Sequence, residues 1–128
     1  MAQLVELMDY SSFIFANKGD FMAGESRFQA SLIREIKRKY PGAVIIKPDS
    51  GYLQGIPDRL ILYQDKWAAF ECKAAEYSGH RINQDYYIDI LDEMSYASFV
   101  YPQNKERFFY ELQQTLRPNR PTRISFRV

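Results

Sequence analysis

Residues 55–73 read GIPDRLILYQDKWAAFECK and contain two short hydrophobic runs separated by a few polar residues. Residues 58–63 and 67–73 each have the length and the aliphatic and aromatic content that are typical of β-strands. The polar residues 64–66 between them predict a tight turn. We therefore expect a β-hairpin in the middle of the chain.

Charged residues stand at one end of this predicted hairpin. Asp58 opens the first strand, and Glu71 and Lys73 close the second. Side chains two apart in a strand point to the same face, and the short turn brings Asp58 opposite the other two. Two carboxylates held together repel unless a cation lies between them, and their oxygens suit Mg²⁺ or Mn²⁺. The backbone carbonyl of Cys72 is a further candidate ligand, whereas its thiol is expected in the core.

Phosphodiester hydrolysis is the reaction that this set of groups suits best. A divalent metal at the two carboxylates would lower the pKa of bound water and neutralise charge on a phosphodiester. Lys73 would orient the water, help to activate it, or stabilise the pentavalent phosphate. An isolated Glu-x-Lys, or an isolated Asp after Pro, is more often structural. The catalytic interpretation depends on their combination at the end of an apolar strand.

The secondary structure of the flanking segments is predicted from their hydrophobic periodicity. Residues 25–40 place Phe28, Leu32 and Ile36 at helical spacing, and the Pro-Gly pair that follows ends the predicted helix. The remaining predictions are a strand at 43–47, a polar loop at 49–55, a helix at 82–94, a strand at 97–101 and a helix at 104–116. The order α-β-β-β-α-β-α predicts a single α/β domain in which helices flank a mixed sheet.

Composition limits the class of protein. The length of 128 residues fits one domain, and 46% hydrophobic with 26% charged residues excludes a disordered chain. One cysteine excludes a disulfide framework and a cysteine-rich zinc site, and it fits a reducing compartment. No apolar run has the length of a membrane span, and the N-terminus lacks a signal-peptide pattern. We expect a cytoplasmic protein with no membrane partner.

Charge is spread unevenly along the chain, although the net charge is only +1. Residues 25–40 carry five basic and two acidic side chains, and residues 117–128 carry four basic side chains and no acidic one. A basic helix and a basic tail could follow a phosphate backbone, but a solvated helix face and a solubilising tail explain them equally well. The first 20 residues are apolar and irregular, so we expect a short helix or an arm that packs on a partner subunit. The predicted organisation is an arm at 1–24, a core at 25–116 and a tail at 117–128.

The sequence Gly55-Ile56-Pro57-Asp58, twelve further residues and then Glu71-Cys72-Lys73 resembles the signature of the PD-(D/E)xK nuclease superfamily. The resemblance is closest to the virus-type replication-repair nuclease (VRR-NUC) domains and to phage Holliday-junction resolvases. Members of the former group read Gly-x-Pro-Asp, then Glu-x-Lys, then a Gln that opens the next helix, and Gln84 has that place here. The similarity covers about residues 24–112. It implies a restriction-endonuclease-like fold and, for the origin of the chain, a phage or prophage.

The resemblance also implies a role for each matching residue. Asp58 and Glu71 would bind the metal, Lys73 would assist the nucleophilic water, and Glu25 would complete the metal shell from the first helix. Gln84 would contact the site or the DNA backbone. The chain departs from the family pattern at residues 74–78, where a small, Gly-rich stretch is usual, so that loop's contacts do not carry over.

Other residues are candidates for catalysis or for DNA contact. His80 could act as a general base, but it lies in a polar loop, where a surface role is more typical. Several tyrosines could stack on unpaired bases, although their spacing is more typical of core or dimer surface; they are Tyr86, Tyr87, Tyr96, Tyr101 and Tyr110. The basic residues expected at phosphates are Lys47, Arg34, Lys37, Arg81, Arg117 and Arg120.

Together these features predict a Mg²⁺- or Mn²⁺-dependent DNA endonuclease that acts as a homodimer on branched DNA in the manner of a Holliday-junction resolvase. A domain with little room for a base-reading module is unsuited to reading a long sequence, and a dimer could cut two strands symmetrically. Alternatives within the superfamily are flap or single-strand cleavage and a homing or restriction role. Outside it, the alternatives are a catalytically silent DNA-binding module on the same fold and an α/β interaction protein with an accidental motif.

Overall fold

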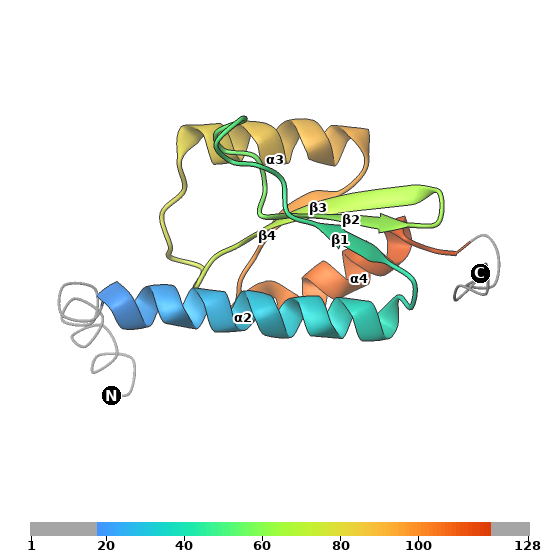
Figure 1. Cartoon of the computed structure of the whole chain (residues 1–128), viewed down its shortest axis with the longest axis horizontal. Coiled ribbons are helices and arrows are strands. Elements are labelled where there is room, and N and C mark those ends of the chain that lie inside the picture. Colours follow the sequence, from blue (N-terminus) through green and yellow to red (C-terminus); the bar gives the residue numbers. More distant parts are fainter. Residues whose placement is uncertain (1–17, 119–128) are drawn as a thin grey trace.

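The computed structural model describes residues 18–118, with side chains from residue 23 onward, as one mixed α/β domain (Figure 1). Three α-helices, a four-stranded sheet and one 3₁₀ turn follow in the expected order within this range. They are α2 (Lys18–Lys39), β1 (Val44–Ile46), β2 (Arg59–Tyr63), β3 (Lys66–Cys72), α3 (Ile82–Met94), β4 (Ala97–Val100), the 3₁₀ turn η1 (Pro102–Asn104) and α4 (Lys105–Thr115). The predicted mixed α/β class and the order of its elements are therefore confirmed.

The sheet has the strand order β1-β2-β3-β4. β1 pairs with β2, and β2 with β3, in antiparallel fashion, while β3 and β4 are parallel. A two-residue turn joins β2 to β3, and Gln64 in that turn has a φ of 57°, as tight hairpin turns require. Arg59 pairs with Phe70, so the next step of this register sets Asp58 against Glu71.

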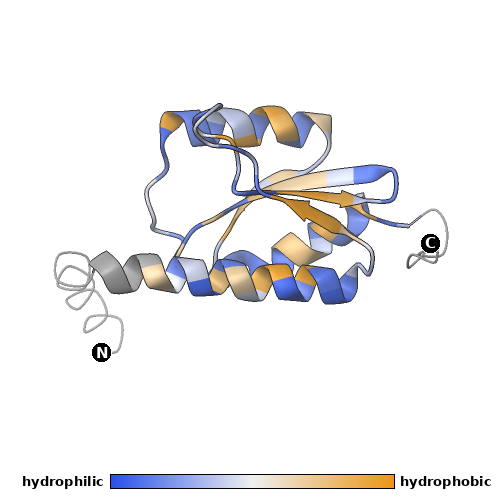
Figure 2. Cartoon of the chain, viewed as in Figure 1, coloured by the Kyte–Doolittle hydropathy of each residue, from blue (hydrophilic) through white to orange (hydrophobic). Residues whose placement is uncertain are grey.

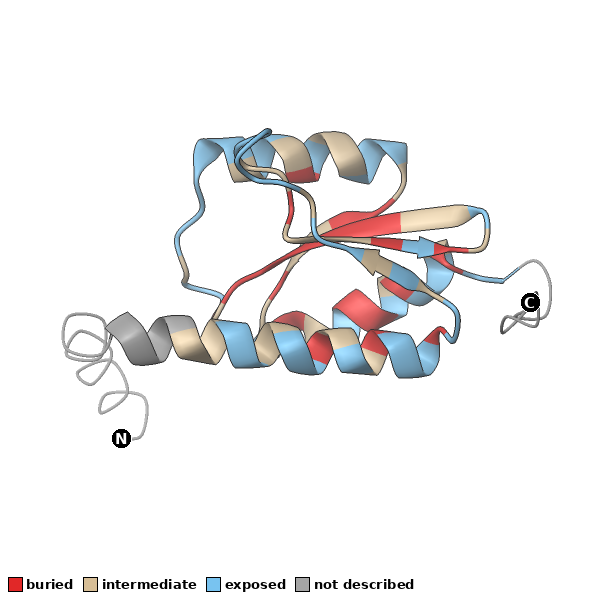
Figure 3. Ribbon diagram, viewed as in Figure 1, coloured by how far each residue is buried: buried red, intermediate tan, exposed pale blue. Residues whose placement is uncertain are grey.

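Helices cover both faces of the sheet. Figure 1 shows α3 on one face, with α2 and α4 on the other. The strands are the most continuous hydrophobic segments (Figure 2), and the buried residues gather along β3 and β4 and on the sides of α2 and α4 that face the sheet (Figure 3). β3 is thus a central strand with both faces covered, which explains its unbroken apolar run.

Alternate residues of β3 belong to different cores. Ala68, Phe70 and Cys72 pack in the larger cluster with residues of α2 and α4. Ala69 packs in the smaller cluster with Ile88 of α3. The alternation of side chains along a strand places the odd-numbered residues that follow, 71 and 73, on the α3 face.

The first helix begins earlier than the sequence predicts. It starts at Lys18 rather than at Glu25, so it continues across the expected boundary between arm and core. Gly19 and Gly24 have low helix propensity and interrupt the apolar pattern, which hid this extension. Residues 1–17 and 119–128, which hold most of the predicted arm and tail and also Arg120, lie outside the described residues.

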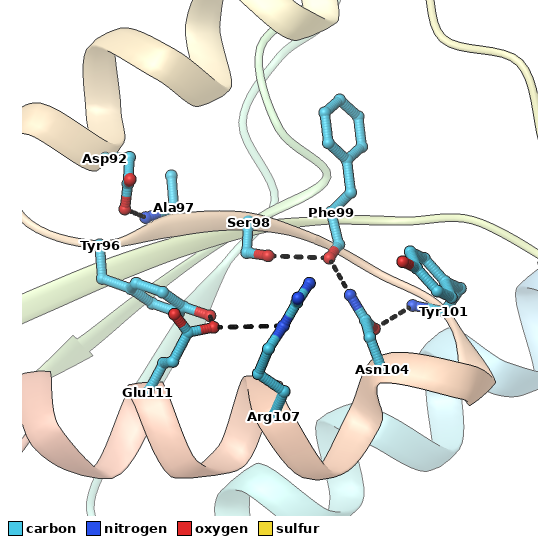
Figure 4. A network of polar contacts seen from close by, with 9 residues as sticks. All are labelled: Asp92, Tyr96, Ala97, Ser98, Phe99, Tyr101, Asn104, Arg107 and Glu111. Carbon is cyan, nitrogen blue, oxygen red and sulfur yellow. Dashed lines mark hydrogen bonds and ion pairs between the residues drawn. The ribbon is translucent and has the colours of Figure 1, made fainter. Parts of the chain in front are cut away.

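A polar network fastens β4 to α4 (Figure 4). The Asn104 side chain accepts a hydrogen bond from the Tyr101 backbone N–H at 2.9 Å and donates one to the Phe99 carbonyl at 3.0 Å. The Tyr96 hydroxyl donates to Glu111 of α4 at 3.2 Å. Figure 4 shows the Phe99 ring pointing away from α4, so the network holds that ring on the α3 side of the sheet. None of the helices between residues 18 and 118 is both long and apolar enough to cross a membrane.

Candidate functional site

The charged end of the hairpin forms as the sequence predicts. The backbone N–H of Cys72 donates a hydrogen bond to Asp58 Oδ2 at 2.9 Å, which fixes the Asp58 carboxylate beside the end of β3. The register places Glu71 next to it on the same face. The thiol of Cys72 is fully buried in the larger core, and burial raises its pKa, so Cys72 acts here through its backbone.

Gln84, in the first turn of α3, joins the groups at this end of the sheet. Its Oε1 accepts hydrogen bonds from Lys73 Nζ at 2.8 Å and from the Arg81 backbone N–H at 3.1 Å. Its Nε2 donates to Glu71 Oε2 at 3.3 Å. One neutral amide therefore holds the ammonium and the carboxylate in fixed positions and also caps the start of the helix.

Glu71 is the most perturbed carboxyl group of the site. It is only 5% exposed, and its pKa is raised to about 8. Burial is the largest cause, followed by the negative charge of Asp58, with Lys73 acting in the opposite direction. Two carboxyl groups this close favour a shared proton, or a cation in its place, because both cannot be ionised without a large cost.

Lys73 is buried as well, with 8% of its surface exposed. Its backbone N–H continues the pairing with β4 by donating to the Val100 carbonyl at 2.9 Å. Its Nζ lies 5.8 Å from the centre of the Phe99 ring. A buried lysine held by one amide oxygen and an aromatic face keeps hydrogen-bonding capacity for a ligand.

Glu25 approaches from the other side of the sheet. It is partly buried in α2, and its pKa is raised by burial and by the charge of Asp58, while Lys73 lowers it. Gln29, one turn later in α2, lies near the Cys72 thiol and lowers its pKa, against the larger effect of burial. The structure therefore brings Glu25 within electrostatic range of the hairpin site.

A pocket of about 150 Å³ opens at this cluster. Two predicted site carboxyl groups, Gln84 and the loop between β1 and β2 form its walls, and the lining residues are Ser50, Gln54, Gly55, Ile56, Asp58, Glu71, Arg81, Asn83 and Gln84. The two acidic residues face a neutral, polar rim and one arginine. This combination suits an anionic ligand bound through a cation.

The predicted phosphate contacts fall into two groups. Arg81 is exposed and lines the pocket, and Lys47 is exposed at the start of the loop that reaches it. Arg34 and Lys37 are exposed on α2, about 14 and 18 Å further along the helix axis than Glu25 at 1.5 Å per residue. Arg117 follows α4.

The position of Arg117 is given by its neighbour Pro118. Pro118 lines a separate pocket with Tyr40 and Tyr63, at the end of β2 opposite to Asp58. The structure thus brings Arg81 to the site, puts Lys47 at the start of the loop that reaches it, and leaves Arg34, Lys37 and Arg117 away from it.

Two features near the site had no clear signal in the sequence. His80 stacks on the Phe99 ring at 3.8 Å and is bonded to Asp85 at 3.0 Å, so this exposed histidine is held in place beside the ring that also contacts Lys73. Phe99 lies on β4, and only the parallel pairing of β4 with β3 brings it here. Asn83 is the second feature, and its place in the pocket depends on how the loop packs against α3.

The donor set of the site can be tested against a metal ion. Within residues 23–118, no group of three or more histidine, cysteine, aspartate and glutamate side chains lies close enough together to hold one. Mg²⁺, however, commonly takes only one or two protein carboxylates and completes its shell with water and substrate phosphate. The adjacent carboxyl groups of Asp58 and Glu71 fit that mode of binding.

No family model matches the chain, and neither a curated protein nor a solved structure matches it.

Proposed function

We propose that this chain is a metal-dependent DNA endonuclease with a restriction-endonuclease-like fold. The observation that carries the proposal is the side-by-side placement of Asp58 and Glu71, with the buried Lys73 held next to them through Gln84. This arrangement joins residues from a hairpin and a helix, and a structural ion pair on a surface would need neither the burial nor the bridging amide. The mixed sheet with helices on both faces agrees with the proposed fold.

Each group has a distinct task in the proposed reaction. Mg²⁺ or Mn²⁺ bound between Asp58 and Glu71 would lower the pKa of a bound water molecule and would neutralise negative charge on the phosphodiester. Glu25 adds negative charge from α2, which strengthens the attraction of the site for a cation. Lys73 donates hydrogen bonds toward the attacking water or a phosphate oxygen, and Gln84 fixes its direction.

Branched DNA is the substrate that we favour, cut by a homodimer with one site in each subunit. The resemblance to junction resolvases, the small size of the domain and the symmetry of a dimer agree with paired nicks in a junction. A nuclease of this kind would act in the cytoplasm, which also fits its buried free cysteine.

Cleavage of a set of labelled substrates tests this proposal. A four-way junction, a flap, a duplex and a single strand would each be incubated with Mg²⁺, with Mn²⁺ or with EDTA. We expect paired nicks at symmetric positions in the junction, none with EDTA, and a loss of at least about 100-fold in rate for Lys73→Ala. A sedimentation experiment on the same protein should show a dimer.

The matched control is Lys66→Ala. Lys66 is the first residue of β3, whereas Lys73 directly follows its last, and Lys66 pairs with Asp65 at the end of the strand far from the site. Its removal should leave the cleavage rate unchanged. If another substrate is cut and its cleavage depends on Lys73 in the same way, the proposed nuclease activity is supported and the assignment as a junction resolvase is wrong. If no substrate is cut and the Glu71→Ala variant still binds DNA, the chain is a catalytically silent DNA-binding module and not an enzyme.

A further inference from the structure

The loop between β1 and β2 displays an aromatic side chain beside the pocket. Tyr52 is 88% exposed, although the loop that carries it is well bonded internally. Asp49 accepts hydrogen bonds from the backbone N–H groups of Gly51, Tyr52 and Leu53 at 2.8, 3.2 and 3.2 Å. The ordered turn therefore holds the apolar surface of the Tyr52 ring in water, where it is available to a ligand.

The loop is packed directly against the first turn of α3. Gly55 has a φ of +90°, and a Cβ placed there would lie 2.4 Å from the Asn83 Cβ. Ser50 and Gln54, on either side of Tyr52 in the sequence, both line the 150 Å³ pocket. The close approach of Gly55 therefore fixes the loop, and with it Tyr52, at the rim of the candidate site.

A second aromatic surface lies on α3 next to this loop. Asn83 lines the pocket, and Tyr86 and Tyr87 follow it by three and four residues, which places them on the same side of the helix. The two rings meet edge to face at 5.2 Å, and Tyr86 is 56% exposed. Two other tyrosines of the described residues differ, because Tyr96 is 7% exposed and Tyr110 lies on α4, on the opposite face of the sheet.

We propose that Tyr52 and Tyr86 bind unpaired bases of the substrate next to the pocket, with Tyr87 supporting Tyr86. This inference rests on the proposed nuclease function and names the part of the substrate that the site selects. Aromatic rings stack on any base with an exposed face, and the paired bases of an intact duplex offer none. Arg81, which lines the same pocket, is placed for the phosphate between such bases. The enzyme would thus prefer DNA with single-stranded character at the cut, such as an opened branch point.

Equilibrium binding in EDTA tests this inference without cleavage. The probes are a labelled single strand of about 20 nucleotides, which exceeds the usual site size, and the duplex of the same sequence. Stacking contributes about 1–3 kcal/mol per base, so Tyr52→Ala and Tyr86→Ala should each weaken single-strand binding by about fivefold to 150-fold. Binding of the duplex should change by less than about twofold, and Tyr52→Phe and Tyr86→Phe should retain single-strand binding, because the ring remains.

Tyr110→Ala is the matched control, since Tyr110 is similarly exposed at 65% but lies away from the pocket. Alanine variants that bind the single strand as the wild type does, or that lose single strand and duplex equally, would overturn the inference. If the base-binding inference fails in this way but Lys73-dependent cleavage is observed, the proposed nuclease function is still supported. If the tyrosine effect appears but no substrate is cut, the base-binding surface stands and the nuclease function fails. A wild-type protein that binds neither probe would overturn the inference, and cleavage of the four-way junction would still decide the nuclease function.

Discussion

The contacts of Gln84 lead to a prediction that distinguishes a positioning role from that of an ordinary surface residue. Its side chain satisfies Lys73 Nζ and Glu71 Oε2 at the same time. Gln84→Ala leaves both buried groups without that partner, so the free energy of unfolding should fall by about 1–3 kcal/mol. The cleavage rate should fall by about 10-fold to 100-fold because Lys73 loses its fixed direction. Urea unfolding and single-turnover cleavage measure the two effects.

The exposed Gln114 of α4 provides the matched control for that experiment. Gln114→Ala should change neither quantity measurably. Gln84→Glu separates the two contacts, since a carboxylate still accepts from Lys73 but repels Glu71. If Gln84→Ala cleaves DNA at the wild-type rate, the amide does not position the lysine, and its role is confined to the start of α3.

Glu71 makes the stability of the protein depend on pH. Its pKa rises from 4.5 to about 8 on folding, so between these values the folded state binds the proton more tightly than the unfolded state does. The contribution of this protonation to the free energy of unfolding is fully present below pH 4.5 and is lost as the pH rises toward about 8. In EDTA, the free energy of unfolding should therefore decrease from about pH 5 to about pH 8.

Glu71→Gln should remove most of this pH dependence. The amide keeps an oxygen that can accept from Gln84, and it no longer places a negative charge beside Asp58, so the variant should be about 1–2 kcal/mol more stable than the wild type near pH 8. Mg²⁺ or Mn²⁺ should raise the melting temperature of the wild type near pH 8 and that of Glu71→Gln much less, because the metal competes with the proton. Equal metal effects in both proteins would exclude Glu71 as a ligand.

At the scale of the elements, the junction between the β1–β2 loop and α3 is the contact most sensitive to one added methyl group. Gly55→Ala would place a Cβ within 2.4 Å of Asn83 and would require the left-handed conformation at φ +90°. Backbone strain alone costs about 1–2 kcal/mol, and displacement of the loop should also lower the cleavage rate, because the loop forms one wall of the pocket. Thermal melting and single-turnover cleavage measure these losses.

Gly79→Ala is the control at the same scale, since nothing lies within 4 Å of a Cβ at that position. It should leave both the melting temperature and the cleavage rate close to those of the wild type. A Gly55→Ala protein with unchanged stability would mean that the loop does not pack tightly on α3 in solution. The base-binding surface that includes Tyr52 would then lose its structural support.

The elements differ in how well the sequence predicts them, and the difference has a physical cause. The hairpin and α3 were predictable because their hydrophobic patterns and their ends are local features, and Ile82–Met94 has the predicted bounds. Asp58 and Glu71 could be placed together because a two-residue turn fixes the register between their strands. The approach of Gly55 to Asn83 and the position of Phe99 beneath Lys73 depend on packing between elements far apart in the chain. No local pattern encodes such contacts.

At the scale of the whole molecule, charge predicts how DNA binding responds to salt. The net charge is +1 for the whole chain. Of the basic residues expected at phosphates, within the described residues only Arg81 lines the pocket, and Lys47 is exposed at the start of the loop that forms one of its walls. Each neutralised phosphate of a duplex contributes about −0.9 to the slope of log K against log salt. With two such contacts we expect a slope of about −2 per protomer on a short duplex, far shallower than that of proteins that contact many phosphates.

Anisotropy titrations in EDTA over a range of salt concentrations would give this slope. Arg81→Ala should make it shallower by about one, since one phosphate contact is lost. Arg34→Ala and Lys37→Ala should leave it unchanged, because both residues lie well along α2 from the site. A slope steeper than about −5 would require phosphate contacts beyond the pocket, such as those of the basic face of α2, and DNA would then extend along that helix.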